Sequence, residues 1–486
     1  MKSASIVIDQ STTASKVYLI DETGTILDAC SKTHNKYYPD KGWVEHDPQQ
    51  IWEQVLECIR RLILAHGDEM KFVRASITNQ RETVVAWNKE TGKPVCNAIV
   101  WQCARTNDLC RKMIREGHEP FVLQRTGLKI DPYFSATKMK WILDHCEVDR
   151  QKVRFGTIDS WLIYKLTNGK VHATDHTNAS RTLLYGLESE TWDDELCTLF
   201  GIERSMLPDI LCSDDVFGWT DLNGLLKEPI PIQGVMGDSQ AAFYAQRCVH
   251  EGDIKMTLGT GSSIMMNSSK RQPRIDGLVN VLGYKMKESR AYGVEGIVNC
   301  NGESLNWAKE DMRWFFDYDE LNEDLFERSS SVLFVPALTG LSMPYWNPAA
   351  QGMFIGVGRQ SRREDFLLAV IHGVICQLCD ALACFGSAGM PVRVDGGLSR
   401  NKFIMQLLAD LSGRTIEVCE HPDLSAMGVW LAGSGKNDFK RKTNTLYPKR
   451  PDAWRQAQLE RYHRAIDCVL MLANVKKEET EDETKI

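Results

Sequence analysis

The alternation of apolar and polar positions predicts two similar β-hairpins, one at the start of the chain and one just past its middle. The segment IVIDQSTTASKVYLI, residues 6–20, sets a polar turn between two apolar strands, and residues 25–34 predict a third strand that completes an antiparallel meander. The segment IKMTLGTGSSIMMN, residues 254–267, repeats this design around a glycine-containing tip. The repetition indicates a duplicated fold.

Helical patterns follow each hairpin. A helix is expected to start at Asp47–Pro48, because Asp favours the N-cap and Pro the first helical position, and apolar residues then recur at helical spacing over 51–62. Two short strands bracket the polar loop NQRE, residues 79–82. The second half holds long helical patterns at 366–385 and 403–413. This mixture of strands and helices predicts an α/β fold.

The length of the chain predicts two domains. Its 486 residues exceed the roughly 250 to 300 at which single hydrophobic cores stop growing. A turn-rich stretch at 213–231 and the second hairpin place the expected domains at 1–246 and 247–472. Residues 473–486 are dense in charge and poor in apolar side chains, so a disordered tail is expected there.

Composition narrows the classes of function and location. The formal net charge of −7 argues against a nucleic-acid-binding surface, and no apolar run approaches the roughly 20 residues of a membrane span. Fifteen scattered cysteines and an N-terminus without an apolar signal core favour reduced thiols in the cytoplasm. Cys376 and Cys379 form a CxxC within an apolar helical pattern, so core packing is favoured over metal binding. A homo-oligomer is compatible with this composition.

The turn of the first hairpin carries groups that suit a metal-bound phosphate. Asp9 ends the first strand, where a carboxylate can hold hydrated Mg²⁺. The hydroxyls of Ser11, Thr12 and Thr13, with backbone N–H groups, can line an anion-binding turn, and Lys16 adds positive charge. The turn alone is weak support for a nucleotide site.

Glycine-containing turns in the second half strengthen this interpretation. Gly259, Thr260 and Gly261 form the tip of the second hairpin. A third turn, DGG at 395–397, follows the apolar strand VRV, with Asn401 one helical turn beyond. A plain tight turn before a helix is the alternative for that segment. Three such turns favour one nucleotide shared between the halves.

Asp238 is the candidate general base. It lies where an apolar strand ends in Gly237 and a helix begins, so its carboxylate is expected to face the cleft between the halves. Capping of the helix is an equally good reading of Asp238 alone, because Asp satisfies free N–H groups at helix starts. Asp9 at the corresponding place favours catalysis, since metal-assisted phosphoryl transfer needs one acidic group near Mg²⁺ and another at the attacking hydroxyl.

Arg81 and Glu82 are candidates for binding a polyhydroxylated substrate. Neighbours on a regular strand face opposite ways, so both can meet one ligand only from a loop. An Arg donor beside a Glu acceptor suits hydroxyls, which both donate and accept hydrogen bonds. A surface ion pair of little energetic value is the alternative. Trp101 and Tyr133 can pack a carbon chain or bond a hydroxyl, although core aromatics have the same signature.

These residues lie in motifs that resemble the glycerol kinases of the FGGY carbohydrate-kinase family. The resemblance extends from about Ser5 to about Ala432 and is carried, in order, by ITNQRET, AIVWQC, IDPYFS, GTIDSWLIYKLT, DHTNASRTLL, GTG, VPALTGLSMPYW and VDGG. It implies two ribonuclease H-like domains of the actin and hexokinase type around a catalytic cleft. It also implies transfer of the ATP γ-phosphate to the terminal hydroxyl of a polyol.

The resemblance also assigns roles to residues at matching motif positions. It implies that Asp238 is the base, that Asp9 orients the hydrated magnesium with Asp238 nearby, and that four residues line the polyol site: Arg81, Glu82, Trp101 and Tyr133. The terminal phosphates are assigned to Thr12, Thr13 and Lys16, the inner phosphates to Gly259 and Thr260, and the adenosine to Gly302, Asn306, Gly397 and Asn401.

Several positions depart from the family pattern. Ser11 stands where glycerol kinases usually have Gly, and Lys16 stands in place of Arg, which keeps the charge but loses the bidentate fork. Ser239 and Ser263 replace a Gln and a Phe that usually shape the glycerol pocket. Both replacements remove volume, so a four- or five-carbon polyol or a ketose is the alternative substrate. The family's loop for fructose bisphosphate is unmatched in DLNGLLKEP.

Two further functions compete with a kinase. A catalytically idle sensor would bind ATP without forming a phosphorylated product, but Asp9, Arg81, Glu82 and Asp238 are all in place. An actin-like filament ATPase would give no reason for the NQRE loop. The sequence therefore favours a kinase that uses ATP and Mg²⁺ on a small polyol, most simply glycerol.

Overall fold

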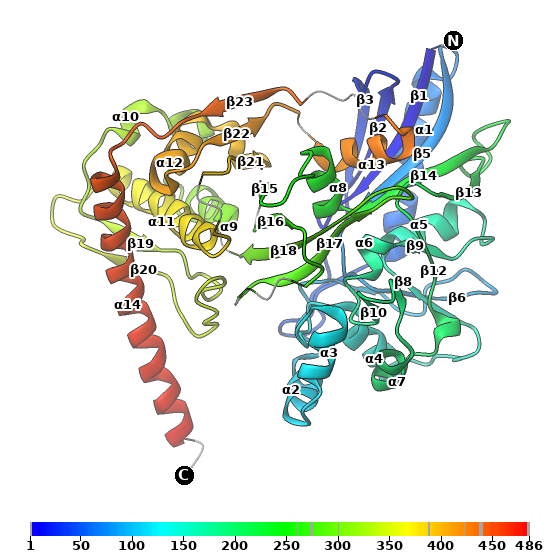
Figure 1. The fold of residues 1–486 in the computed structure, drawn as a ribbon, viewed down its shortest axis with the longest axis horizontal. Helices are drawn as coiled ribbons and strands as arrows, with labels where there is room; N and C mark the ends of the chain where they lie inside the picture. The colour runs from blue at the N-terminus through cyan, green and yellow to red at the C-terminus, as the bar shows by residue number, and fades with distance from the viewer. Residues whose placement is uncertain are drawn as a thin grey trace.

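The structure is a computed structural model that describes residues 2–259, 261–272, 275, 277–299, 301–386, 389–421, 423–436 and 441–483. Two halves, each built on a mixed β-sheet, lie side by side along the long axis of the molecule (Figure 1). The first sheet has six strands in the spatial order β13 (Val216–Thr220), β14 (Ile230–Gly237), β5 (Met70–Asn79), β1 (Lys2–Gln10), β2 (Ala14–Asp21) and β3 (Ile26–Thr33). The second has seven, in the order β17 (Val279–Lys285), β18 (Arg290–Val298), β16 (Ser262–Ser268), β15 (Ile254–Leu258), β21 (Val392–Asp395), β22 (Ile416–Cys419) and β23 (Thr443–Leu446).

The two sheets share one arrangement of five strands. β1 pairs antiparallel with β2 and parallel with β5, which pairs parallel with β14. In the same way, β15 pairs antiparallel with β16 and parallel with β21, which pairs parallel with β22. A further antiparallel strand, β3 or β18, extends each hairpin. The duplicated α/β fold that the sequence predicts is confirmed.

The helices of the two halves follow the same order. The principal helices are α1 (Pro48–His66), α5 (Ile158–Leu166), α8 (Asp238–Ala245), α11 (Arg363–Ala383), α12 (Lys402–Ser412) and α13 (Leu424–Ser434). Asp47 caps α1 by accepting a hydrogen bond from the Gln49 N–H, and Pro48 occupies the first turn, as predicted. The apolar face of α1, from Ile51 to Leu62, is buried against the first sheet.

Helices α8 and α13 join the two halves. α13 comes from the second half of the sequence but packs on β14, β5 and β1 of the first sheet and on α8. A Cβ on Gly428 would lie 2.0 Å from the carbonyl oxygen of Ala241, and one on Gly433 would lie 2.3 Å from that of Gln233. Glycine is therefore required for this close approach, and the spatial halves do not divide the chain at a single position.

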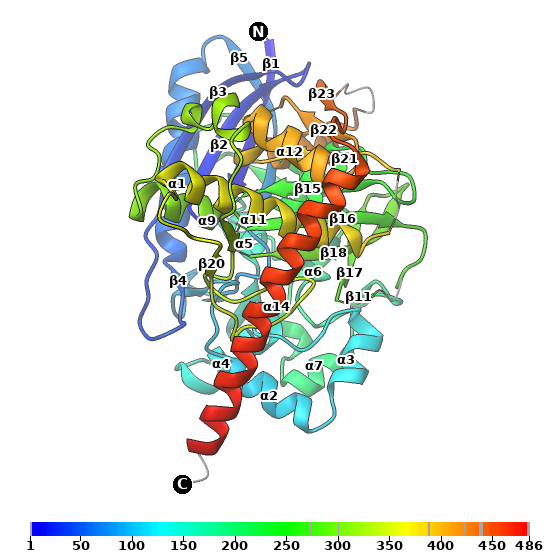
Figure 2. The same cartoon turned by 90° about the vertical axis from the view of Figure 1, so that its left-hand side faces the viewer.

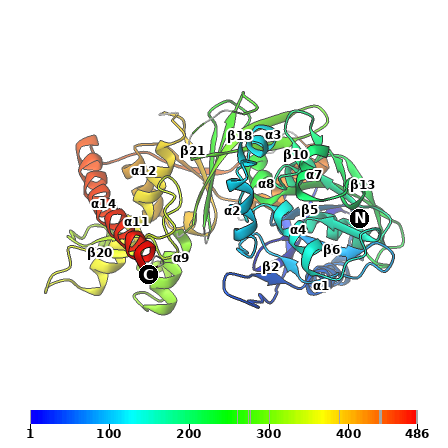
Figure 3. The same ribbon diagram turned by 90° about the horizontal axis from the view of Figure 1, so that it is seen from below.

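A smaller region of short elements lies between β5 and β13 and carries the aromatic candidates of the site. It consists of β6 (Val85–Asn88), β7 (Ala98–Ile99), α2 (Asn107–Arg115), α3 (Glu119–Thr126), α4 (Ser135–His145), β8 (Val153–Gly156), β9 (Ala173–Asp175), α6 (His176–Ala179), β10 (Tyr185–Gly186), β11 (Thr191–Trp192), α7 (Asp194–Phe200) and β12 (Asp209–Leu211), with β4 (Glu45–His46) pairing with β7. Seen from below, this region lies beside the second sheet (Figure 3). It has a hydrophobic core of its own.

The second half contains a long C-terminal helix. α14 (Asp452–Glu483) runs diagonally across α11 and α12 (Figure 2). Its backbone is helical over 473–483, where composition predicts a disordered tail; Lys and Glu, which dominate this stretch, are strong helix formers. The remaining elements of this half are α9 (Asn301–Asn306), α10 (Glu323–Phe326), β19 (Leu333–Val335) and β20 (Met353–Ile355).

Helix α11 is the core helix of the second half. In the described ranges it is the one helix whose length and composition would suit a membrane span, and 78% of its most apolar window is buried inside the protein. Cys376 and Cys379 are buried on it. Both belong to the hydrophobic core cluster of this half, and no group of three or more metal-ligating side chains occurs among the described residues. The cysteines of the described ranges are all free thiols.

Candidate active site

The loop between β5 and β6 carries Arg81 and Glu82. Glu82 has a backbone φ of 59°, a left-handed conformation that few residues other than glycine adopt. The loop predicted for this pair is confirmed, and both side chains are buried. Such strain in a non-glycine residue is typical of functional sites, where the surrounding structure holds it in place.

Arg81 and Glu82 belong to a buried group of four charged side chains, which we call the charged cluster: Arg81, Glu82, Arg181 and Glu295. Arg81 Nη2 donates to Glu295 Oε1 at 2.8 Å and its Nη1 to Oε2 at 3.3 Å. Arg181 Nε donates to Glu82 Oε1 at 2.6 Å, and its Nη2 lies 3.1 Å from Glu295 Oε2. No member is more than 5% exposed. The cluster is thus an interior network and not a surface ion pair.

The pKa values of the cluster show which carboxylate is held more firmly in the charged form. Burial opposes ionisation of Glu295, but the guanidinium groups of Arg81 and Arg181 outweigh it and lower the Glu295 pKa to about 2. Burial raises the pKa of Glu82 despite the same two cations. Glu295 is therefore the fixed anion of the cluster.

Asp238 lies at the exposed edge of the charged cluster. It is the first residue of α8, whose N-cap, Gly237, has no side chain to cap the helix. Its Oδ1 accepts from the adjacent Ser239 N–H at 2.6 Å and lies 3.5 Å from Arg81 Nε. The Asp238 side chain is 40% exposed, in contrast to the cluster. Its carboxylate is available to a ligand that reaches Arg81.

Two aromatic side chains form a wall next to the cluster. Trp101 and Tyr133 meet edge to face with ring centroids 5.4 Å apart, and both are half-buried. The guanidinium of Arg181 lies 5.8 Å from the ring centre of Tyr133. Trp101 Nε1 donates to Thr12 Oγ1 at 2.9 Å, so this wall is tied to the turn of the first hairpin. The arrangement brings Arg81, Glu82 and the two aromatics into one region.

Small polar residues and a further cation complete this region. Ser263, on β16, donates its Oγ to Glu295 Oε1 at 2.9 Å, and Ser239 follows Asp238 on α8; both are half-buried. Lys255, on β15, is fully buried, and its Nζ has no hydrogen-bond partner among the described residues. Burial lowers the pKa of Lys255, and attraction to Asp395 and Glu295 opposes that shift.

The turn of the first hairpin holds a buried carboxylate that fits a hydrated cation. Asp9 is 7% exposed and lies opposite Lys16 in the β1–β2 register. Burial raises the Asp9 pKa to about 7, with Lys16 lowering it and Asp238 raising it. Ser425 Oγ, in the first turn of α13, donates to Asp9 Oδ2 at 3.0 Å. A divalent cation would favour the ionised form, and Mg²⁺ commonly uses one or two carboxylates with water and phosphate.

The other residues of this turn are placed unequally. Ser11 closes the turn, since its Oγ donates to the Ala14 carbonyl at 3.0 Å, and its hydroxyl is thereby engaged within the protein. Thr12 is half-buried and Thr13 is exposed. Lys16 is 39% exposed and lies 3.6 Å from Asp423, the residue before α13. The turn therefore offers Thr12, Thr13 and Lys16 to a ligand more readily than Ser11.

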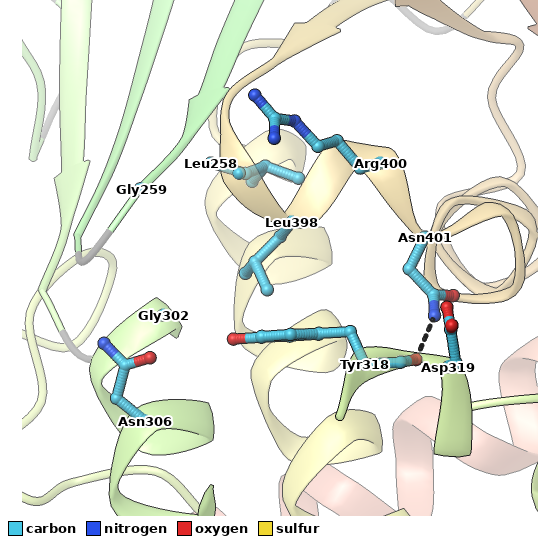
Figure 4. A pocket seen from close by; sticks show the side chains of 10 residues that line it. Leu258, Gly259, Gly302, Asn306, Tyr318, Asp319, Leu398, Arg400 and Asn401 are labelled. Atoms are coloured by element: carbon cyan, nitrogen blue, oxygen red, sulfur yellow. Dashed lines mark hydrogen bonds between the residues drawn. The ribbon is translucent and has the colours of Figure 1, made fainter. Parts of the chain in front are cut away.

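A pocket of about 490 Å³ lies in the second half, beyond the hairpin tip (Figure 4). It is lined by Leu258, Gly259, Gly302, Asn306, Tyr318, Asp319, Gly397, Leu398, Arg400 and Asn401. Five of these residues are nucleotide-site candidates from the sequence, and the fold brings them together. Thr260 lies outside the described residues.

The pocket depends on glycine at one turn and on a cap at the next. Gly396 has φ 99°, and a Cβ there would lie 2.4 Å from the Leu258 carbonyl oxygen, so only glycine fits between β15 and the start of the pocket wall. Asn401 Oδ1 accepts from two N–H groups at the start of α12, and its Nδ2 donates to the Tyr318 and Leu321 carbonyls. Asn401 thus shapes the pocket as a structural cap.

Sequence reasoning missed several residues of this site. Glu295 is a charged residue in the otherwise apolar strand AYGVEGIV, which is a usable signal of a buried ion pair. Arg181 lies inside the motif DHTNASRTLL but bears no local sign of its partner. Tyr318 and Asp319 come from a short 3-10 helix, Tyr318–Glu320, with no preceding strand to mark it.

Comparison with known proteins agrees with this geometry. Models of the FGGY family of carbohydrate kinases match residues 4–244 with the N-terminal domain and 254–434 with the C-terminal domain. The chain is 41% identical over 437 residues to glycerol kinase 1 of Thermotoga maritima, covering 87% of this chain and 89% of that protein. It is 40% identical over 442 residues to glycerol kinase of Escherichia coli O81, covering 88% of each.

Solved structures share the whole fold. The crystal structure of Plasmodium falciparum glycerol kinase with ADP superposes with a TM-score of 0.88 at 29% identity, covering 96% of this chain and 98% of that one. A ligand-bound xylulose kinase from Lactobacillus acidophilus gives a TM-score of 0.85 at 21% identity, covering 96% and 98%. The second likeness concerns the fold alone.

Proposed function

The chain belongs to the FGGY family of carbohydrate kinases, and we propose that it transfers the γ-phosphate of ATP to a terminal hydroxyl of glycerol, giving glycerol 3-phosphate. The observation that carries this proposal is the 41% identity to a glycerol kinase over 87% of the chain, which includes both halves. The placement of Asp238 beside the charged cluster supports it.

Asp238 is the proposed general base. Its carboxylate is accessible, whereas the carboxylates of Glu82 and Glu295 are buried and paired. Arg81 and Glu82 would orient the hydroxyls of the polyol, and Trp101 and Tyr133 would cover its carbon chain. Asp238 then accepts the proton of the attacking hydroxyl as its oxygen bonds to the γ-phosphorus and the bond from that phosphorus to the departing ADP oxygen breaks.

ATP and Mg²⁺ are the proposed cosubstrate and cofactor. Mg²⁺ supplies charge neutralisation at the phosphates. Asp9 would orient its hydration shell with Asp238 nearby, and Thr12, Thr13 and Lys16 would face the terminal phosphates. The inner phosphates are assigned to Gly259 and Thr260, and the adenosine to Gly302, Asn306, Gly397 and Asn401; the pocket that holds five of these residues supports the assignment.

A substrate panel tests the proposal. Purified protein with Mg-ATP is offered glycerol, erythritol, threitol, xylitol and xylulose, and the phosphorylated product is measured. We expect the highest kcat/KM with glycerol. ATP binding without product from any of these substrates would instead support the idle-sensor function.

A longer polyol or a ketose is the second candidate substrate. It is favoured by the small side chains of Ser239 and Ser263 beside Asp238 and Glu295, which leave volume and polar groups near the reacting hydroxyl. A clearly higher kcat/KM for a four- or five-carbon substrate in the same panel would establish this alternative and overturn glycerol.

We also propose a cytoplasmic location and a division of the chain into functional domains at 1–246 and 247–472. The free cysteines in the described ranges support a reducing compartment. The polyol candidates up to Ser239 fall in the first domain, and the pocket residues fall in the second. Ser263 and Glu295 extend the polyol site into the second domain.

A further inference from the structure

Glu295 links the two halves of the molecule at the polyol site. It projects from β18 of the second sheet and meets two guanidinium groups of the first half, those of Arg81 and Arg181. Arg81 engages both carboxylate oxygens of Glu295, at 2.8 and 3.3 Å. A two-point contact of this kind fixes the plane of the guanidinium as well as its position.

Both oxygens of Glu295 contact protein groups. Oε1 accepts from Arg81 and from the Ser263 hydroxyl at 2.9 Å, while Oε2 accepts from Arg81 and lies within ion-pair distance of Arg181. The side chain is 0% exposed. Glu295 therefore has no access to a ligand, and any effect on substrate must pass through the residues that it holds.

Arg81 is the residue through which Glu295 would act. The same guanidinium that is held by Glu295 places Nε 3.5 Å from Asp238 Oδ1, and Gln240 accepts from Nη1 at 3.1 Å. Without the carboxylate at 295, Arg81 would have Asp238 and Glu82 as its remaining anionic partners. Its guanidinium would then turn toward the proposed base and away from the polyol hydroxyls.

We propose that Glu295 is a positioning residue of the polyol site, which holds Arg81 from the opposite half of the molecule. This inference rests on the proposed function for its substrate. The polyol site is then complete only when the second sheet is docked on the first half. The nucleotide pocket contains neither Glu295 nor its partners, so the effect is confined to the polyol.

The variant Glu295→Gln tests this inference, because it preserves shape and removes the charge. We expect the KM for the polyol to rise about 10- to 100-fold, the range for losing a hydrogen bond to a charged group, while the KM for ATP stays within about twofold. Glu295→Asp keeps the charge and should recover part of the loss. An unchanged polyol KM in Glu295→Gln would overturn the inference.

Glu190 provides a matched control. This carboxylate of the first half also joins two cations of the second half, Lys285 and Arg290, and accepts from the Tyr292 hydroxyl at 2.7 Å. It is partly buried, with its side chain 14% exposed, and none of its partners belongs to the site. Glu190→Gln should lower the melting temperature without changing either KM. If Glu295→Gln and Glu190→Gln change the KM values equally, the role of Glu295 is structural and is not specific to the polyol site.

The position of Arg81 gives a readout that does not depend on the substrate. In a crystal structure of Glu295→Gln, we expect the Arg81 guanidinium to be displaced toward Asp238. If the wild-type protein phosphorylates no polyol, the proposed function is wrong. The inference about Glu295 is tested separately, because a variant structure in which Arg81 keeps its wild-type position would overturn it. Should Glu295→Gln fail to fold, Ser263→Ala removes one hydrogen bond to Glu295, and its crystal structure should show the Arg81 guanidinium displaced toward Asp238; an Arg81 that keeps its place there would overturn the inference.

Discussion

The proposed polyol side and the proposed nucleotide side of this molecule are built on opposite principles. The polyol side is a closed network of charged side chains, none of them more than 5% exposed, with Asp238 at its accessible edge. The nucleotide side is an open pocket of about 490 Å³ in which glycine, Leu and Asn predominate. We expect the polyol side to select its ligand by fixed charges and hydrogen bonds. We expect the nucleotide side to select its ligand by the space in the pocket and by the close approach that its glycines allow to the backbone. Each side should therefore fail under a different kind of substitution.

The largest effect is expected on the polyol side, at the proposed base. Asp238→Asn keeps the shape of the side chain but removes proton acceptance, which typically contributes about 10²- to 10⁴-fold to the rate. We expect kcat to fall by at least that range, measured by product formation with Mg-ATP, while nucleotide binding measured by calorimetry persists. Turnover near that of the wild type would show that Asp238 is not the base.

A substitution that fills space should damage the nucleotide side selectively. A Cβ on Gly397 meets no atom within 4 Å, so the position opens into the pocket. Gly397→Leu should raise the KM for ATP about 10- to 100-fold, the range of a typical overpacking energy, and leave polyol binding intact. Gly397→Ala is the control and should have little effect. A larger change in the polyol KM than in the ATP KM would contradict the proposed division of the site.

The two sides should also differ in their response to pH. The Asp9 carboxylate must be ionised to hold Mg²⁺, and its pKa is raised to about 7, so Mg²⁺ affinity should rise by up to about tenfold per pH unit below 7 and level off above. Because folding raises the Asp9 pKa, the protonated Asp9 side chain favours the folded, metal-free protein at low pH. This contribution to the free energy of unfolding is fully present below the ordinary pKa of Asp and is lost as the pH rises toward 7. Calorimetric titration of Mg²⁺ from pH 5.5 to 8.5 measures the affinity.

The charged groups of the proposed polyol site should respond differently from Asp9 in the same pH range. The Glu295 pKa is lowered to about 2 and the Arg81 pKa is raised, so neither charge changes between pH 5.5 and 8.5. The Arg81–Glu295 pair should therefore add no pH dependence to polyol binding where Mg²⁺ affinity rises. An Mg²⁺ affinity independent of pH would remove Asp9 from the metal site.

The smallest effect is expected at the contact between the two sides. Trp101 Nε1 donates to Thr12 Oγ1, which links the aromatic wall to the phosphate turn. Trp101→Phe keeps a smaller aromatic ring and loses one hydrogen bond, worth about two- to tenfold in binding. We expect modest increases in both KM values from steady-state kinetics. A change in the polyol KM alone would show that this hydrogen bond does not couple the two sides.

Local sequence patterns predict much of this molecule because its repeated elements are local. The two hairpins, the Asp47–Pro48 helix start and the loop at Arg81 and Glu82 all follow from short segments. The assignment of Gly302 and Asn306 to the nucleotide comes instead from the resemblance to the kinase family. The charged cluster does not, since its pairs are 99 residues apart for Glu82 and Arg181 and 214 for Arg81 and Glu295. The return of α13 to the first sheet is equally non-local, because close packing at Gly428 and Gly433 is decided by partners far away in the sequence.

The most direct test is a crystal structure with glycerol and ADP bound together. We expect a terminal hydroxyl of glycerol within about 2.6–3.2 Å of the Asp238 carboxylate, with Arg81 and Glu82 on its other hydroxyls and the nucleotide in the pocket that contains Gly397. Glycerol bound away from Asp238, or an Asp238 carboxylate turned out of the space between the polyol and nucleotide sides, would contradict the account.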